Sequence, residues 1–284
     1  MSSQTSKILF IGAGAWSSKV TKIIQEQDSN IEVQVISARN FLALSENSPQ
    51  YFSALHDNEL VWITTNPSLQ CKVLRKFGKV KTKIILEKPI AQTQLELLEI
   101  KEAICTSTSE IYLSQPWIYS DVWNKTLKLF FEKESINKIV FEMGDNRIRT
   151  DIAPGLDWLP HELYFATSIA EQFKAKDSEI EVEILNYSPE RISAKIKIGG
   201  RLNLKIESGL FSTKIAQAFG FANQDLVVTS NFVTGEIMSL DGVSANSEVL
   251  PTNLSILNMI TQFRSNSPNL NWGLIFKLYS CFLR

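Results

Sequence analysis

Residues 7–17 read KILFIGAGAWS, and this stretch decides the fold of the first half of the chain. The apolar run predicts a buried strand, and the glycines predict a tight turn. The residues after this turn are predicted to form a helix. Gly14 has no side chain, so a pyrophosphate can approach the backbone at the positive end of that helix. The stretch predicts a dinucleotide site, with a plain strand-turn-helix connection as the alternative interpretation. The expected cofactor contacts are Gly12, Ala13, Gly14, Ala15 and Trp16.

The pattern that starts at residue 7 continues to about residue 114 as short apolar runs alternating with amphipathic segments. Strands are predicted at residues 7–11, 32–37, 59–64, 82–86 and 110–113. Helices are predicted at residues 15–25, 68–77 and 92–105. Because parallel strands need crossover connections, this alternation predicts an α/β Rossmann domain, doubly wound, over residues 1–115.

The second half of the chain has a different texture, dominated by alternating strands. Residues 192–198 and 202–206 alternate apolar and polar side chains on either side of Gly199-Gly200, which predicts a hairpin with one buried face. Other strands are predicted at residues 136–143, 214–220, 225–229 and 233–239. Helices are predicted at residues 120–133, 161–173, 252–264 and 271–282. We therefore expect an α+β domain with a largely antiparallel open sheet over residues 116–284.

Composition argues against several classes of protein. The 284 residues are 44% hydrophobic with a net charge of −1. The chain therefore lacks the excess of basic residues expected of a protein that binds nucleic acid. No apolar run approaches the ~18 residues of a membrane span. Three separated cysteines and two histidines predict neither disulfides nor a metal site. With a short polar N-terminus, these features lead us to expect a cytoplasmic protein with reduced thiols.

The second predicted strand ends at Ser37-Ala-Arg-Asn, the position that distinguishes NAD from NADP. In NAD sites an acidic side chain here accepts a hydrogen bond from the ribose 2′-hydroxyl. No carboxylate is present, whereas Ser37 offers a hydroxyl and Arg39 a guanidinium suited to a 2′-phosphate. We expect NADP as the cofactor, with NAD as the alternative. A solvated loop side chain is the alternative interpretation of Arg39.

Residues 60–67 (LVWITTNP) and 84–90 (IILEKPI) resemble the glucose-fructose oxidoreductase, inositol dehydrogenase and MocA (Gfo/Idh/MocA) family. The Glu87-Lys-Pro motif is its most recognisable local signature, and the likeness extends over essentially the whole chain, including the crossover at 115–117. The resemblance implies an NAD(P)-dependent oxidoreductase that moves hydride between nicotinamide and a carbonyl or alcohol of a sugar, nucleotide sugar or polyol. It implies further cofactor contacts from Thr64, Thr65, Asn66, Gln70, Glu87 and Lys88.

The resemblance also implies three catalytic residues, Lys88, Asp157 and His161, the last two at the family's Asp-x-x-x-His spacing. Alcohol oxidation needs a base for the hydroxyl proton, and an imidazole suits proton transfer near neutral pH. The Lys88 ammonium would stabilise a developing alkoxide. Asp157 is expected to cap a helix and to orient Lys88 or His161. The alternative interpretation is a packed or capping histidine beside an ordinary helix cap.

Three positions depart from the family pattern: Ser17 at the third fingerprint position, Gln70 where many members have His, and Glu162 where Asp is common. Two other functions stay open on the same fold. One is reduction of an imine, and the other is a non-catalytic sensor of the nicotinamide redox state. The expected partners are a small-molecule substrate and, through the sheet as is common in the family, a second copy in a homodimer or homotetramer. No metal is needed for this chemistry.

Overall fold

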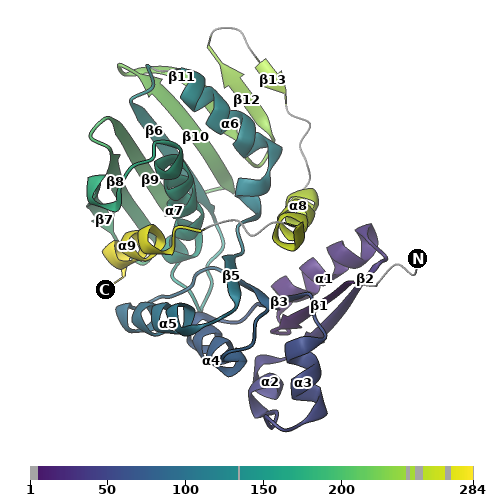
Figure 1. Cartoon of the computed structure of the whole chain (residues 1–284). Coiled ribbons are helices and arrows are strands. Elements are labelled where there is room, and N and C mark those ends of the chain that lie inside the picture. The colour runs from purple at the N-terminus through teal and green to yellow at the C-terminus, as the bar shows by residue number, and fades with distance from the viewer. Residues whose placement is uncertain (1–5, 134, 241–243, 247–251, 266–269, 284) are drawn as a thin grey trace. The chain divides into compact units, whose positions relative to one another are not determined.

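The computed structural model describes residues 6–133, 135–240, 244–246, 252–265 and 270–283. The chain divides into two compact units, drawn in Figure 1. The first comprises Met1–Ser114 and Ile256–Leu270, and the second comprises Gln115–Ser255 and Asn271–Leu283. Within the described residues, no helix is long and apolar enough to cross a membrane.

A five-stranded parallel sheet of order β2-β1-β3-β4-β5 forms the centre of the first unit. Its strands are β1 (Ser6–Ile11), β2 (Ile31–Ile36), β3 (Leu60–Ile63), β4 (Lys83–Leu86) and β5 (Glu110–Leu113). The longer connecting helices are α1 (Ala15–Gln27), α4 (Pro67–Phe77) and α5 (Gln94–Thr106). All four β3 residues are buried, which is typical of a central parallel strand. The predicted Rossmann α/β fold is confirmed.

The strand order reverses at β1, which has β2 on one side and β3 on the other. Backbone hydrogen bonds continue one residue past three strand ends. Gly12 N donates to Ile36 O at 2.8 Å, Thr64 N to Ile11 O at 2.9 Å, and Glu87 N to Ile63 O at 3.0 Å. These bonds hold the following loops together at the carboxyl edge of the sheet, where open α/β sheets bind ligands.

The structure adds two short helices, α2 (Ala38–Ala43) and α3 (Pro49–His56), where the sequence pattern predicts only a connection. Each is capped by a serine, because Ser37 accepts from Asn40 N and Ser48 accepts from Tyr51 N. At six and eight residues they span at most about two turns, too few to display a helical period in the sequence.

The second unit contains an eight-stranded sheet of order β13-β12-β11-β10-β6-β9-β8-β7. Among the described strands of this second sheet, only the β6–β9 pair is parallel, so the expected largely antiparallel sheet is confirmed. The strands are β6 (Lys138–Asp145), β7 (Ile180–Tyr187), β8 (Arg191–Ile198), β9 (Leu202–Leu210), β10 (Ile215–Ala222), β11 (Asp225–Asn231), β12 (Glu236–Ser239) and β13 (Ser244–Asn246). The predicted hairpin corresponds to β8 and β9.

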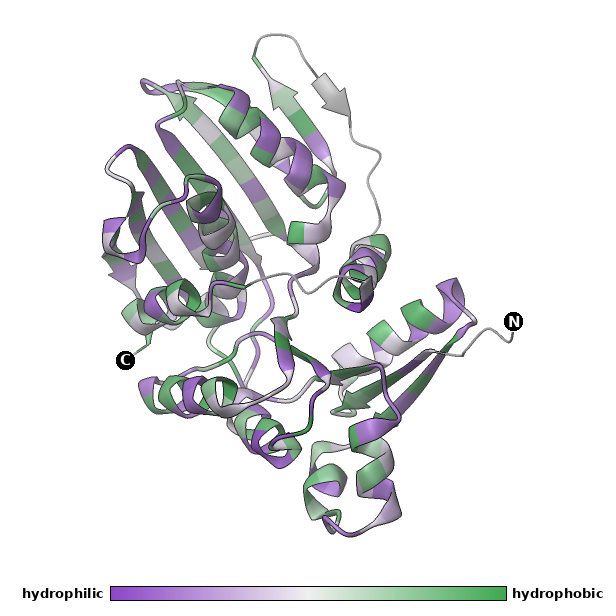
Figure 2. Ribbon diagram, in the orientation of Figure 1, coloured by the Kyte–Doolittle hydropathy of each residue, from purple (hydrophilic) through white to green (hydrophobic). Residues whose placement is uncertain are grey.

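Helices lie across one face of this sheet (Figure 1). Helix α7 (Pro154–Gln172) packs on β6, β8 and β9, α6 (Asp121–Glu132) on β11 and β12, and α9 (Trp272–Phe282) beside β7 and α7. The strands accordingly alternate apolar and polar residues, visible as green and purple bands in Figure 2. On β8, Ile196 is buried while Lys195 is exposed and pairs with Glu183 at 3.6 Å.

The first unit is discontinuous in sequence, because α8 (Thr252–Ser265) packs into it. The ring of Phe263, fully buried, stacks on Tyr112 of β5 at 4.5 Å between centroids. Lys83 Nζ donates to the carbonyl oxygens of Phe263 and Arg264 at 2.8 and 2.9 Å. Arg264 Nε in turn lies 3.0 Å from Glu59 Oε1. One helix therefore contacts β4, β5 and the residue that precedes β3.

Candidate functional site

The turn after β1 can be made only by glycine at position 12. Its φ is +133°, in the region that side chains rarely adopt. A Cβ at Gly12 would lie 2.5 Å from Thr64 Oγ1 and 2.8 Å from Thr64 O. The Thr64 hydroxyl instead donates to Gly12 O at 3.1 Å. The β1 and β3 loops are thus in direct backbone contact at the point where the strand order reverses.

Gly14 is the N-cap of α1, and its surroundings are open. A Cβ at Gly14 would meet nothing within 4 Å. The first backbone N–H groups of α1 have no partners within a helix and attract negative charge. Ser17 occupies the third fingerprint position with 1% exposure, and its hydroxyl donates to Gly14 O at 2.8 Å. The serine therefore fits a tightly packed position, and the turn fits a pyrophosphate.

Glu87, at the end of β4, is buried and bonded to two indoles. Its Oε1 accepts from Trp16 Nε1 at 2.6 Å and from Trp62 Nε1 at 2.9 Å. Burial raises the pKa of the Glu87 carboxyl, and these hydrogen bonds oppose the rise. The carboxyl therefore connects β4 to α1 and β3. Cofactor contacts of Glu87 and Trp16 stay predictions.

Gln70 connects the loop after β3 to the loop after β4. Its buried Nε2 donates to Thr65 O at 3.0 Å and to Glu87 O at 2.7 Å. Asn66 caps α4, since its Oδ1 accepts from Leu69 N at 3.2 Å. The side chains of Gln70 and Asn66 thus hold the loops in place. Direct contact of either side chain with a cofactor stays a prediction.

Ser37 and Arg39 lie at the carboxyl end of β2. The Ser37 hydroxyl accepts from Asn40 N at 3.1 Å and keeps its own proton to donate. The Arg39 side chain is exposed, and in the part of the chain that the structure describes it forms no ion pair. Its guanidinium donors are therefore available to a ligand, as a 2′-phosphate site requires.

In the second unit, Asp157 and His161 lie on α7, one turn apart and on the same side of the helix. The expectation that Asp157 caps this helix is wrong. The cap is Ala153, because Pro154 fits the first helical position, where its missing N–H is not needed. Pro160 accordingly lies inside the helix rather than in its first turn. Lys88 belongs to the first unit, so its joint action with these two residues stays a prediction.

Asp157 and His161 have polar partners that the sequence does not indicate. Asp157 Oδ1 lies 3.4 Å from Arg149 Nη1, and Arg149 also forms a bidentate pair with Asp151 at 2.8 and 3.0 Å. His161 is 6% exposed, and its Nδ1 lies 2.9 Å from Gln115 Oε1. No local pattern marks Arg149, which follows β6 in a polar loop. The one sequence signal that includes Gln115 is the crossover at residues 115–117.

Two indoles flank the His161 ring. Trp117 approaches it edge-on, with centroids 6.2 Å apart and an interplanar angle of 74°. Trp158, one turn earlier on α7, has its ring centroid 5.7 Å away. Lys214 Nζ lies 6.0 Å from the Trp117 ring centroid. The imidazole is therefore held in an aromatic setting that limits its orientation.

Glu162 points the other way on α7, into the sheet. It is fully buried, and its Oε1 accepts from Glu207 N at 3.2 Å. Burial raises the pKa of Glu162 well above its usual range. The folded chain therefore holds a proton on this carboxyl at a pH at which the unfolded chain has released it.

Glu162→Gln is expected to remove a pH dependence of stability. Since the folded-state pKa is raised, the parent loses stability as pH rises from about 4.5 through that pKa, with a slope of up to about 1.4 kcal/mol per pH unit. The amide keeps an oxygen for Glu207 N and does not titrate. Denaturant unfolding between about pH 5 and 8 should show that the free energy of unfolding of the variant increases relative to that of the parent as pH rises. Exposed Glu183→Gln is the control, and a parallel profile for Glu162→Gln would refute the assignment.

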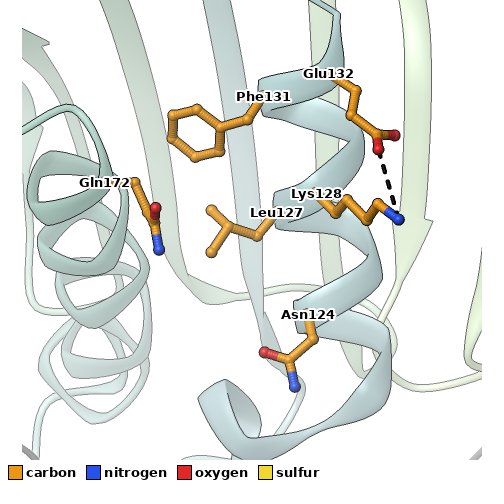
Figure 3. A pocket seen from close by; sticks show the side chains of 6 residues that line it. All are labelled: Asn124, Leu127, Lys128, Phe131, Glu132 and Gln172. Atoms are coloured by element: carbon orange, nitrogen blue, oxygen red, sulfur yellow. Dashed lines mark ion pairs between the residues drawn. The ribbon is translucent and has the colours of Figure 1, made fainter.

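A shallow hollow of 380 Å³ lies between α6 and the end of α7 (Figure 3). Leu127 and Phe131 of α6 point toward Gln172, and Lys128 pairs with Glu132 on the same helix. Its remaining lining residue is Asn124. None of the residues predicted from the sequence lines this hollow. Within the described residues, no group of three or more His, Cys, Asp or Glu side chains is arranged to hold a metal ion.

No family model matches the sequence, and no curated protein matches it. Solved structures do resemble it in fold. UDP-N-acetylglucosamine 3-dehydrogenase from Acidithiobacillus ferrooxidans superposes with a TM-score of 0.68 and 13% identity, covering 98% of this chain and 96% of its own. Scyllo-inositol dehydrogenase from Lactobacillus casei gives 0.67 and 13%, covering 100% and 96%. Biliverdin reductase from Synechocystis, solved with biliverdin and NADP+, gives 0.62 and 11%, covering 97% and 96%. The chain has the two-domain fold found in these sugar and inositol dehydrogenases.

Proposed function

We propose that the protein is an NADP(H)-dependent oxidoreductase that transfers hydride between nicotinamide and a carbonyl or alcohol carbon of a sugar, nucleotide sugar or polyol. The observation that carries this proposal is the turn after β1. It combines a glycine that no other residue can replace with open space at the N-terminus of α1, at the point where the strand order reverses. Open space at a helix N-terminus suits a bound pyrophosphate better than it suits close packing.

The residues at the carboxyl edge of the first sheet fit a dinucleotide. Backbone N–H groups of residues 14–16 would hold the pyrophosphate, and Ser37 with Arg39 would hold a 2′-phosphate. Lys88, half-buried after β4, would hydrogen-bond the substrate oxygen and the nicotinamide carboxamide. When bound, the nicotinamide supplies or accepts the hydride.

The chain's own residues supply the proton chemistry. His161 would take the hydroxyl proton during oxidation and return it during reduction, the usual role of an imidazole near neutral pH. The Lys88 ammonium would lower the free energy of the developing alkoxide. Asp157, paired with Arg149, would fix the first turns of α7 and thereby the direction of His161. The sugar and inositol dehydrogenases of similar fold support a polyhydroxylated substrate.

Arg39→Ala is expected to weaken NADPH binding about tenfold to a hundredfold, because a charge-assisted hydrogen bond contributes about 1.5–3 kcal/mol. NADH binding should hardly change, since NADH lacks the 2′-phosphate. Titration of the purified protein with each nucleotide, followed by nicotinamide fluorescence, measures both effects.

The matched control is Arg75→Ala, which removes a guanidinium of the same unit that pairs with Glu102 at 2.7 Å. Its nucleotide affinities should equal those of the parent. Absence of binding by either nucleotide would overturn the proposed function itself. Equal losses for NADPH and NADH in Arg39→Ala would instead remove only the NADP preference. Once binding is established, carbonyl sugars, inositols and cyclic imines should be screened with NADPH to separate the sugar and imine alternatives.

A further inference from the structure

We infer that Gln115 is a positioning residue that holds neutral His161 with its proton on Nδ1, leaving Nε2 as the atom that exchanges the substrate proton. The tautomer follows from the second unit alone. The role in proton exchange rests on the proposed function.

The contact between the two side chains defines which nitrogen carries the proton. Gln115 Oε1 lies 2.9 Å from His161 Nδ1, and a carbonyl oxygen only accepts hydrogen bonds. Nδ1 must therefore donate. A neutral imidazole has a single N–H, so Nε2 is left with its lone pair. Gln115 is 1% exposed and His161 is 6% exposed, so water competes little for this bond.

The surrounding chain fixes both partners. Gln115 immediately precedes the 3-10 turn Pro116–Tyr119, whose Trp117 approaches the His161 ring edge-on. Trp158 packs against the ring from the preceding turn of α7. Turning the imidazole over would replace Nδ1 by a carbon at Gln115 Oε1 and lose the bond. One short segment, residues 115–117, thus supplies both the hydrogen-bond acceptor for the imidazole and an indole that packs against it.

The inferred state opposes the intrinsic preference of histidine. In water a neutral histidine side chain favours the proton on Nε2, the form in which Nε2 cannot act as a base. The Gln115 contact reverses this preference without adding a charge beside the ring. A carboxylate at the same place would also select Nδ1–H but would hold the protonated ring more strongly.

The tautomer can be measured without substrate or cofactor. The 284-residue sequence contains two histidines, so His56→Gln leaves His161 as its single imidazole. Long-range ¹H–¹⁵N correlation spectra of this variant, at a pH where the ring is neutral, distinguish a protonated Nδ1 from a protonated Nε2. We expect the Nδ1–H pattern. An Nε2–H pattern would overturn the inference, whatever the enzyme proves to do.

Two variants at position 115 extend the test in the same His56→Gln background. Gln115→Leu should shift His161 toward the Nε2–H pattern, whereas Gln115→Glu should retain Nδ1–H because a carboxylate also accepts. An unchanged Nδ1–H pattern in a folded Gln115→Leu protein would show that another group fixes the ring. If Gln115→Leu does not fold, the parent and Gln115→Glu spectra still decide the tautomer.

Kinetics separate this inference from the proposed function. With a substrate in hand, Gln115→Leu should lower kcat about tenfold to a hundredfold while changing KM and NADPH affinity little, the size of effect seen when the residue that orients a metal-binding histidine is removed. An unchanged kcat despite a shifted tautomer would overturn the positioning role. An Nδ1–H spectrum in a protein that binds no nucleotide would refute the proposed function and leave the tautomer standing.

Discussion

Gly14→Asp is expected to weaken NADPH binding at least about a hundredfold, equivalent to about 2.8 kcal/mol. The new carboxylate would lie at the N-terminus of α1, where it repels the pyrophosphate and accepts the N–H bonds that the pyrophosphate needs. The fold should tolerate the change, because a Cβ at this position meets nothing within 4 Å. An acidic group at a helix N-terminus is, if anything, stabilising.

Fluorescence titration and thermal unfolding together measure this prediction. Gly14→Ala is the matched control, since it adds a Cβ to the same space without charge and should cost clearly less affinity than the Asp variant. Both variants should unfold within a few degrees of the parent. Near-normal NADPH affinity of the folded Asp variant would remove the α1 terminus from the cofactor site.

Gly144→Ala is expected to lower the free energy of unfolding by about 3 kcal/mol, the upper part of the range for overpacked sites. Gly144 of β6 is the register partner of Gly209 on β9. A Cβ at Gly144 would overlap Gly209 O and the Phe211 ring, whose Cε2 would be 2.8 Å away. Because one obstacle is backbone, relief requires the parallel pair to separate near Asp145, just before the loop that carries Arg149.

Denaturant unfolding compares this variant with Gly199→Ala in the β8–β9 turn. Gly199 has φ +58° and open space around it. An alanine there is therefore destabilised only by the left-handed backbone conformation, which costs about 1–2 kcal/mol. A Gly144→Ala loss no larger than the Gly199→Ala loss would contradict the proposed steric cause.

The sequence predicts the Rossmann unit well because most of its strands are short and buried, and because α1, α4 and α5, each about three turns or longer, separate β1 from β2, β3 from β4 and β4 from β5. The β7 strand, by contrast, is missing from the prediction although Ile180, Val182 and Ile184 alternate with glutamates. It is an edge strand whose Val182 and Ile184 are only partly buried, so its apolar period is weak evidence of a core face. Helices α2 and α3 are absent from the prediction because their length and capping serines also suit turns.

The residues of the candidate site also divide into those that the sequence predicts and those that it does not. Gly12 and Gly14 could be predicted because their requirement is local: a positive φ at one and free space at the other. The Gln115–His161 contact joins residues 46 positions apart, and no spacing rule reaches that far. The capping role expected of Asp157 was wrong because Pro154, one turn earlier, satisfies the same rules for a helix start.

The late position of α8 in the sequence affects how the first unit folds during synthesis. N-terminal domains generally fold first while the rest of the chain is still being synthesised. Here Phe263 stacks on Tyr112 and Lys83 bonds to two α8 carbonyls, so the nascent N-terminal sheet lacks these partners until residues 256–265 leave the ribosome. While the roughly half of the chain between β5 and α8 is being made, Tyr112 of β5 therefore lacks its apolar partner, and a chaperone can act on this strand.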